Sequence, residues 1–144
     1  MAKKTPYDPQ RIIPYVLYRD AAAAIEFLKK AFDMTEREIV TGEEGQVLHA
    51  ELNSEGNVIM LGGLDGRSRH GTPDEIGSVH TIVLTYVDDV DAHCARARAA
   101  GAEIVDEPTD QFYGDRTYTA RDPEGHEWAF HQHVHDYDPS ARPE

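Results

Sequence analysis

The stretch Gln111–Val134, QFYGDRTYTARDPEGHEWAFHQHV, contains the strongest structural signals in this chain. It predicts two strands joined by the tight turn Asp122-Pro123-Glu124-Gly125, in which proline presets φ and glycine supplies the permissive corner. Side chains alternate along a strand, so Trp128 and Phe130 share one face, which we expect to lie in the core. The opposite face is open to function and carries Glu127, Ala129 and His131.

Working outward from this stretch, the same order of elements occurs twice. Hydrophobic periodicity and turn residues predict the first set as a strand at 12–18, a helix at 21–32 and strands at 36–41, 46–53 and 57–62. The second set is a strand at 80–87, a helix at 90–100 and strands at 102–106, 115–121 and 126–134. Asp20 and Asp89, the expected helix caps, are as far apart in sequence as the turn glycines Gly56 and Gly125, which favours an internal duplication.

These patterns predict an α+β fold of two βαβββ modules. Pro14 lacks a backbone donor, so the first strand should be short, bulged or unpaired at that point. A polar, glycine-rich loop separates the modules, and loops of this length are often linkers or lids over sites. We divide the chain into a lead-in at 1–10, a first module at 11–61, an inter-module loop at 62–78, a second module at 79–135 and a tail at 136–144.

Charge and composition exclude several functions. The net charge of −13 repels nucleic-acid backbones, and no basic stripe offsets it, so we expect no nucleic-acid partner. No apolar run reaches the roughly 20 residues that span a membrane, and the N-terminal segment lacks an apolar signal-peptide region. We therefore expect a cytoplasmic protein with no membrane partner. Cys94, the single cysteine, is expected to be a buried apolar side chain in the second helix.

The segments IPYVLYRDAAAAIEFLKKAF (13–32) and YVDDV…HQHV (86–134), with the DPEGHEWAF pattern, resemble the vicinal-oxygen-chelate superfamily and, within it, the PhnB-like branch. This superfamily contains glyoxalases, bleomycin-resistance proteins and extradiol dioxygenases. The resemblance implies that the two modules pair into a curled eight-stranded cup, often completed by dimerisation. A small-molecule ligand and a homodimer are the partners that it implies.

The resemblance also implies four metal-ligand positions, two on each module. Counted from the helix caps and the turn glycines, these positions hold Ile13, Met60, Ile82 and Ala129. None of these side chains binds a hard divalent cation. We therefore predict that the metal site of the family is absent and that the chain needs no cofactor.

Strand alternation indicates which residues should face the cup. Apolar and aromatic side chains would form its floor, with a few polar groups for specificity, which is the usual composition of a ligand pocket. The predicted ligand-binding residues are Tyr15, Leu17, His49, Glu51, Met60, His80, Ile82, Tyr86, Glu127 and His131. A binding protein of the glyoxalase/bleomycin-resistance type is the first hypothesis, and the acidic surface suits a cationic ligand such as a glycopeptide antibiotic.

Other functions remain open from the sequence. A displaced divalent-metal site around His80 and Glu127, with His49, Glu51 or His131, would make the chain a metal-dependent lyase or dioxygenase. A metal-free acid–base pair of His80 with Glu127 or Glu51 is another alternative. A non-enzymatic dimeric interaction module would instead fill the cup with its own side chains. The sequence does not decide whether the chain is an enzyme.

Overall fold

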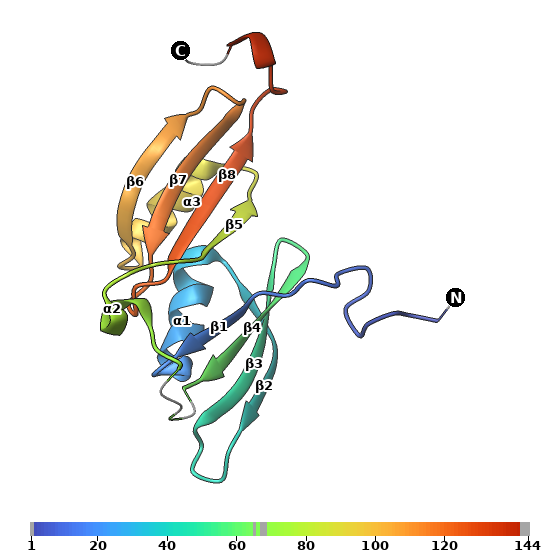
Figure 1. The fold of residues 1–144 in the computed structure, drawn as a ribbon, viewed down its shortest axis with the longest axis vertical. Coiled ribbons are helices and arrows are strands. Elements are labelled where there is room, and N and C mark those ends of the chain that lie inside the picture. The colour runs from blue at the N-terminus through green and yellow to red at the C-terminus, as the bar shows by residue number, and fades with distance from the viewer. Residues whose placement is uncertain (1, 65, 67–68, 142–144) are drawn as a thin grey trace.

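Two similar halves, each a four-stranded sheet backed by one helix, form the computed structural model, which describes residues 2–64, 66 and 69–141 (Figure 1). The first half contains β1 (Tyr15–Tyr18), α1 (Ala21–Phe32), β2 (Thr35–Thr41), β3 (Val47–Ser54) and β4 (Asn57–Gly63). The second contains β5 (Ile82–Tyr86), α3 (Val90–Ala99), β6 (Glu103–Asp110), β7 (Asp115–Arg121) and β8 (Glu127–His133). A short helix, α2 (Pro73–Ile76), lies between them, and a 3₁₀ turn, Pro139–Ala141, follows β8.

The two sheets have the same topology. Their strand orders are β1-β4-β3-β2 and β5-β8-β7-β6, with the first strand of each module parallel to the last. The sheets are separate and do not close into a barrel. The α+β fold of two βαβββ modules predicted from the sequence is confirmed.

Pro14 shortens β1, as its missing donor predicts. The strand begins at Tyr15, although the carbonyl of Pro14 still accepts a hydrogen bond from the Met60 N–H at 3.0 Å. On the N-terminal side of Pro14, the side-chain amide of Gln10 takes the place of backbone pairing with β4. It donates to the Val58 carbonyl at 2.9 Å and accepts from the Val58 N–H at 2.7 Å. The lead-in is thereby attached to the sheet through a side chain.

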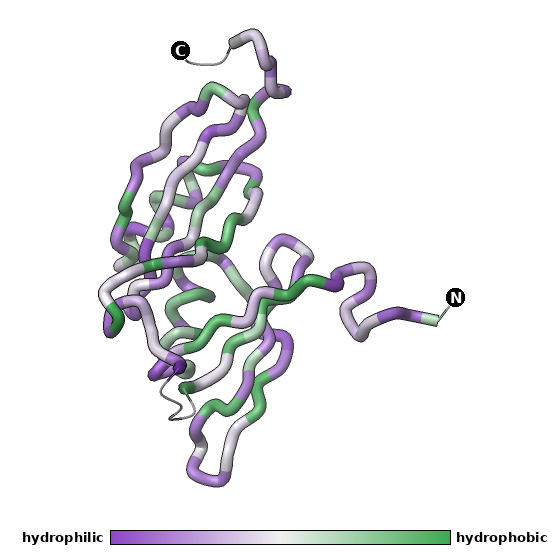
Figure 2. The backbone as a smooth tube through the Cα atoms, in the orientation of Figure 1, coloured by the Kyte–Doolittle hydropathy of each residue, from purple (hydrophilic) through white to green (hydrophobic). Residues whose placement is uncertain are grey.

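The core lies between the sheets and the two helices. Trp128 and Phe130 are 0% and 1% exposed, which confirms their predicted core face, and Cys94 is buried as expected. Helix α1 packs against helix α3 behind the sheets, and Figure 2 shows apolar backbone segments meeting in this central region. Within the described residues, no helix is long and apolar enough to cross a membrane.

The Asp-Pro-Glu-Gly turn also connects the modules, which the sequence did not indicate. The buried carboxylate of Glu124 accepts hydrogen bonds from the backbone N–H groups of Arg19 and Asp20 at 2.7 and 3.0 Å, at the start of α1. The Tyr18 hydroxyl donates to Asp122 at 2.6 Å, and His126 Nε2 lies 2.8 Å from the Leu17 carbonyl. The turn of the second module thus fixes the end of β1 and the first turn of α1.

Some element boundaries differ from those predicted. Strand β6 extends to Asp110, four residues beyond the predicted end, and the expected inter-module loop contains α2. Proline at the first helical position favours this short helix, which has too few residues to show a hydrophobic period. Residues 142–144 of the predicted tail lie outside the described residues.

Candidate functional site

The predicted site residues divide between two sheet faces. Each face is the side of a sheet that points away from its helix. The first face, on the first sheet, carries Tyr15, Leu17, His49, Glu51 and Met60. The second face, on the second sheet, carries Ile82, Leu84, Tyr86, Glu127, Ala129 and His131. His80 precedes β5 at the seam between the modules.

On the first face, the structure brings three predicted residues together. The Tyr15 hydroxyl lies 3.1 Å from His49 Nδ1, and His49 Nε2 lies 3.3 Å from Glu51 Oε2. The buried Glu51 carboxylate also accepts the Tyr7 hydroxyl at 2.8 Å and lies 3.4 Å from Arg37 Nε. Both ring nitrogens of His49 are therefore engaged, and the imidazole is held in one orientation.

Gly62 makes room for this arrangement. A Cβ atom at Gly62 would lie 2.8 Å from Cε1 of Tyr15, because the tyrosine ring crosses directly over the glycine backbone. Strand register places His49 opposite Gly62 and Met60 opposite Tyr15. The absence of a side chain on β4 lets the phenol of β1 reach across to the imidazole of β3.

On the second face, Asp115 is the centre of a polar cluster. Its carboxylate is 4% exposed and accepts the Tyr86 hydroxyl at 2.7 Å. His131 Nδ1 and His133 Nδ1 lie 3.1 and 3.0 Å from its two oxygens. His133 Nε2 in turn lies 2.9 Å from Asp136. Tyr86 and His131 were predicted as site residues, whereas Asp115 was not.

The charge states of this cluster follow from its hydrogen bonds. Burial disfavours the ionised form of Asp115, but the donors Tyr86, His133 and His131 outweigh it and hold the pKa of Asp115 below its ordinary value. The hydrogen bond to Asp115 raises the pKa of Tyr86. Hydrogen bonds to Asp115 and Asp136 raise the pKa of His133. The cluster therefore contains an ionised, acceptor-only carboxylate at neutral pH.

Apolar side chains beside this cluster are half exposed. Ile82, Leu84 and Tyr86 are 51%, 49% and 54% exposed, and Tyr15 on the first face is 53% exposed. Ala129 lies opposite Leu84 and adds only a methyl group to the floor of the face. The two faces thus present open apolar and aromatic surface rather than surface filled by their own side chains.

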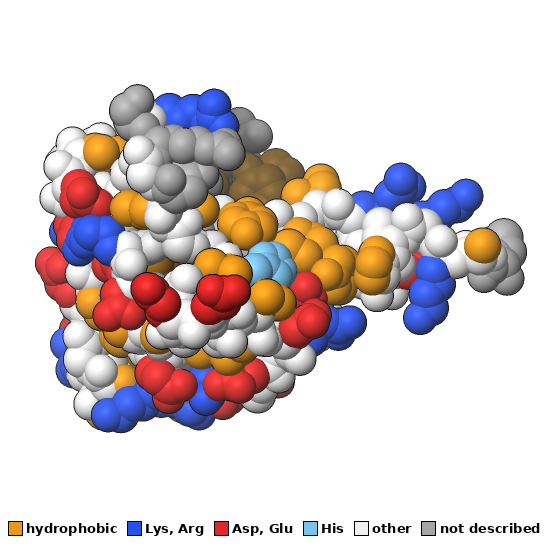
Figure 3. Space-filling view, turned by 90° about the horizontal axis from the view of Figure 1, so that it is seen from below, with side chains coloured by type: hydrophobic (Ala, Val, Ile, Leu, Met, Phe, Trp, Pro, Cys, Tyr) orange, Lys and Arg blue, Asp and Glu red, His pale blue; other side chains and the backbone are white. Residues whose placement is uncertain are grey.

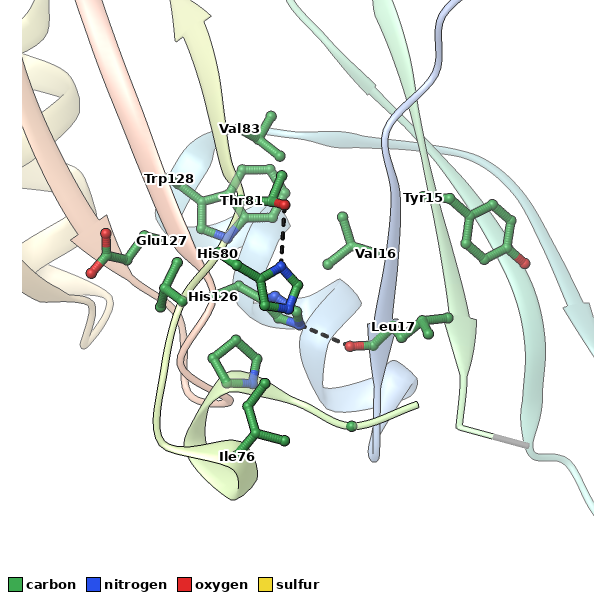
Figure 4. Close-up of a pocket in the computed structure, with 13 residues that line it drawn as sticks. Tyr15, Val16, Leu17, Ile76, His80, Thr81, Val83, His126, Glu127 and Trp128 are labelled. Carbon is green, nitrogen blue, oxygen red and sulfur yellow. Dashed lines mark hydrogen bonds between the residues drawn. The ribbon is translucent and has the colours of Figure 1, made fainter. Parts of the chain in front are cut away.

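A pocket of about 220 Å³ lies at the seam between the modules. Figure 4 shows His80 at its centre, close to Val16 and Val83, with Tyr15 and Glu127 at its edges and directed away from His80. A neighbouring hollow of about 300 Å³ shares Leu17, Ile76 and His80 with it. Seen from below, a histidine lies among hydrophobic side chains on the surface of the molecule (Figure 3).

The alternative pairings predicted for His80 and Glu127 are wrong. His80 Nδ1 lies 3.4 Å from the Thr81 hydroxyl, and Glu127 instead pairs with Arg121 at 3.0 Å. Glu51 belongs to the cluster of the first face. The strand register places Arg121 directly opposite Glu127, so the carboxylate pairs with this neighbouring guanidinium and not with His80.

The chemistry of the site does not fit the divalent metal of the family. Met60 and Ile82, at two of the four inherited ligand positions, lie on the two faces, and Ile13 and Ala129 occupy the other two; none has a donor suited to a hard cation. The displaced ligands His49, Glu51, His80, Glu127 and His131 are distributed over both faces and the seam. Among the residues that the structure describes, no three His, Cys, Asp or Glu side chains are grouped so as to hold a metal ion.

Sequence reasoning missed Asp115, Tyr7 and Arg37. Asp115 begins β7, directly opposite His133 and two residues from Thr117, the cross-strand partner of His131. The alternating pattern of Asp115–Arg121 carried this information, but the contact becomes visible only when the register of β7 and β8 is known. Tyr7 contacts Glu51 from the lead-in, and Arg37 contacts it from the edge strand β2. No local sequence pattern predicts either contact.

Fold and site together define a two-module α+β protein with two four-stranded sheets, each with one face that points away from its helix. The sequence model of the Glyoxalase/Bleomycin resistance protein/Dioxygenase superfamily matches residues 12–130, so the chain belongs to this superfamily. The uncharacterized protein Mb0911c of Mycobacterium bovis is 39% identical over 126 residues, covering 84% of this chain and 82% of the relative. The uncharacterized protein Rv0887c of Mycobacterium tuberculosis is also 39% identical, covering 84% and 73%.

Solved structures show the same fold. TioX from Micromonospora sp. ML1 is 30% identical with a TM-score of 0.71, covering 87% of this chain and 99% of its own. TnmS3, an antibiotic binding protein from Streptomyces sp. CB03234, has a TM-score of 0.67 at 23% identity, covering 88% and 98%. The likeness to TnmS3 concerns the fold alone.

Proposed function

We propose that this chain is a homodimeric binding protein for a neutral or cationic organic molecule held on its two sheet faces. The observation that carries this proposal is the half-exposed row of Ile82, Leu84 and Tyr86 beside an ordered polar cluster. A contiguous apolar surface rimmed by polar groups is typical of a site for a ligand or a partner. The antibiotic-binding fold neighbour and the bleomycin-resistance members of the superfamily support a small-molecule ligand.

A second copy of the chain would complete the site. Drug-sized ligands occupy pockets of roughly 300–1,000 Å³. The seam pocket of a single chain is smaller, at about 220 Å³, and the hollow lined by Leu84 and Tyr86, at about 420 Å³, lies at the lower end of this range. The first face of one copy and the second face of another would together enclose a larger volume. Tyr15, His49 and Glu51 would then face Leu84, Tyr86 and His131 across one cup.

The charge of the protein constrains the ligand. With a net charge of −13, the chain favours neutral or cationic molecules over anions. The aromatic rings Tyr15 and Tyr86 provide surfaces for planar groups, and the fixed His and carboxylate groups accept hydrogen bonds. A cationic glycopeptide such as bleomycin and neutral polycyclic aromatic antibiotics are the two ligand chemistries to test first.

Thermal unfolding in the presence of these ligands tests the proposal. A ligand at about 100 times its dissociation constant stabilises the native state by about 2.7 kcal/mol, which raises the melting temperature by several degrees. Tyr86→Ala should reduce this shift, whereas Val134→Ala, a similarly exposed apolar residue beyond β8, should preserve it. A dimer that none of these ligands shifts would favour a non-enzymatic interaction module instead.

A further inference from the structure

The two ring nitrogens of His131 have different environments. Nδ1 lies 3.1 Å from Asp115 Oδ2, and an ionised carboxylate can only accept a hydrogen bond, so Nδ1 carries the proton. Nε2 is then the unprotonated nitrogen of the neutral ring. Within the described part of the chain, Nε2 has no hydrogen-bond partner and it is not a buried unsatisfied atom. Asp115 thereby fixes the tautomer in which Nε2 is the basic nitrogen of a side chain that is 12% exposed.

Aromatic side chains surround this base. The Tyr86 ring lies 5.6 Å from the His131 ring at 66°, and the Tyr113 ring is stacked at 6.2 Å and 26°. Ala129, two residues before His131 on the same face, has only a methyl side chain and so occupies little space beside the imidazole. Two aromatic rings and a small side chain thus lie beside the imidazole of His131.

A hydroxyl group lies on the neighbouring strand. Thr117 is the cross-strand partner of His131, and its Oγ1 accepts a hydrogen bond from Gln111 Nε2 at 3.0 Å. A threonine hydroxyl that accepts one hydrogen bond still has its own hydrogen to donate to an oxygen or nitrogen atom of a bound molecule. The face thus offers an acceptor and a donor on neighbouring strands, which is the arrangement required for moving a proton.

We propose that Asp115 and His131 form an acid–base centre in which His131 Nε2 removes a proton from a planar conjugated carbon or oxygen acid. The C–H or O–H bond of the substrate breaks, its electron pair stays on the substrate, and the proton moves to Nε2. Asp115 remains ionised and stabilises the imidazolium, while Thr117 donates to the developing charge. The imidazolium then returns the proton to another atom of the substrate or to water, so the step needs no oxidant, reductant or metal.

This proposal rests on the proposed function in one respect, since the substrate must bind on the second face. The acid–base proposal differs from the proposed binding function because it assigns a chemical reaction to the second face. A small probe that reaches Nε2 without filling the whole cup separates the two. The probe is 5-nitrobenzisoxazole, a planar carbon acid: a base takes its C–H proton, the N–O bond breaks, and a coloured cyanophenolate is released.

Elimination of this probe is measured with the wild-type protein and three variants. General-base catalysis contributes on the order of 10²-fold or more, so His131→Gln should lower the protein-dependent rate at least about tenfold. Asp115→Asn should lower it similarly, because the asparagine amide no longer fixes the Nδ1-protonated tautomer. His135→Gln removes an exposed histidine outside both faces and should keep the rate. A wild-type rate no higher than that of His131→Gln overturns the proposal.

A second measurement does not depend on the folding of the Asp115 variant. Long-range ¹H–¹⁵N NMR of the wild-type protein reports which nitrogen of neutral His131 carries the proton. Protonation at Nδ1 supports the acid–base centre, and protonation at Nε2 overturns it. If no antibiotic raises the melting temperature but the elimination rate depends on His131, the ligand proposal alone is rejected. The reverse result would reject the acid–base centre alone.

Discussion

Asp122 shows how a single carboxylate holds two modules together. Its Oδ2 accepts the Tyr18 hydroxyl at 2.6 Å and Trp128 Nε1 at 3.0 Å. Its Oδ1 accepts the backbone N–H groups of Glu124 and His126 at 3.0 and 3.1 Å. Tyr18 belongs to the first module and the other three belong to the second, so removal of this side chain would leave buried donors unpaired in both.

We therefore expect Asp122→Ala to lower the free energy of unfolding by about 3 kcal/mol or more, since each orphaned buried donor costs about 1–3 kcal/mol. Tyr18→Phe should cost about 1.5 kcal/mol, because Asp122 keeps its remaining donors. Urea unfolding measures both. Asp138→Ala, in an exposed segment, is the control and should change stability by less than about 0.5 kcal/mol. Equal losses for Asp122→Ala and Asp138→Ala would contradict this role.

His133 predicts a pH dependence of stability. Its folded pKa is raised above the ordinary value of 6.5 by hydrogen bonds to Asp115 and Asp136. A raised pKa means that the folded state binds the proton more tightly, so the stabilisation is complete below 6.5 and is lost as pH rises through the folded pKa. The difference in urea midpoint between wild type and His133→Gln should be largest near about pH 5.5 and shrink by about pH 9. A difference that is constant over this range would reject the interpretation.

At the scale of elements, the two helices begin in different ways. Helix α3 has a local cap, since Asp89 Oδ1 accepts the Ala92 N–H at 3.0 Å. Helix α1 has the equivalent local cap from Asp20 and, in addition, the Glu124 carboxylate of the second module at the Arg19 and Asp20 N–H groups. A carboxylate at this end also interacts favourably with the helix dipole. The stability of α1 should therefore depend on the second module.

We expect Glu124→Ala to lower the free energy of unfolding by about 2 kcal/mol, against about 1 kcal/mol for Asp89→Ala, an ordinary loss of an N-cap. Hydrogen exchange distinguishes them further. Glu124→Ala should accelerate amide exchange in the first turn of α1, although the substitution is in the other module. Asp89→Ala should accelerate amide exchange only within the second module, in the first turn of α3. Unchanged exchange in α1 of Glu124→Ala would contradict a coupling through this turn.

The elements that could be predicted are those with a local signal. Alternation along β8 places Trp128 and Phe130 in the core, and the periodic apolar residues of α1 define its buried stripe. Contacts such as Asp115 with His131 depend on the register of two strands, and the sequence does not fix that register. The Tyr15–His49 contact additionally requires Gly62 on the strand between them. The sequence therefore indicates which side of a strand a residue occupies more readily than which partner it contacts.

At the scale of the whole molecule, the two faces raise the question of what covers them. Leu84 lies at the centre of the second face and is 49% exposed in the single chain. If a second copy covers this face, a buried carboxylate at position 84 would lack a partner and would oppose association. If the face is covered only by a ligand, the same change would leave the oligomeric state as it is.

We expect the wild-type protein to be a dimer by sedimentation velocity or light scattering, and Leu84→Glu to raise the dimer dissociation constant by at least about a hundredfold, which corresponds to roughly 2.7 kcal/mol. Val134→Glu introduces the same charge at a residue of similar exposure beyond the end of β8 and should leave the dimer intact. Retention of the melting temperature at high protein concentration would show that Leu84→Glu affects association rather than folding. A monomeric wild type would remove the second copy from the site and return ligand binding to the seam pocket around His80.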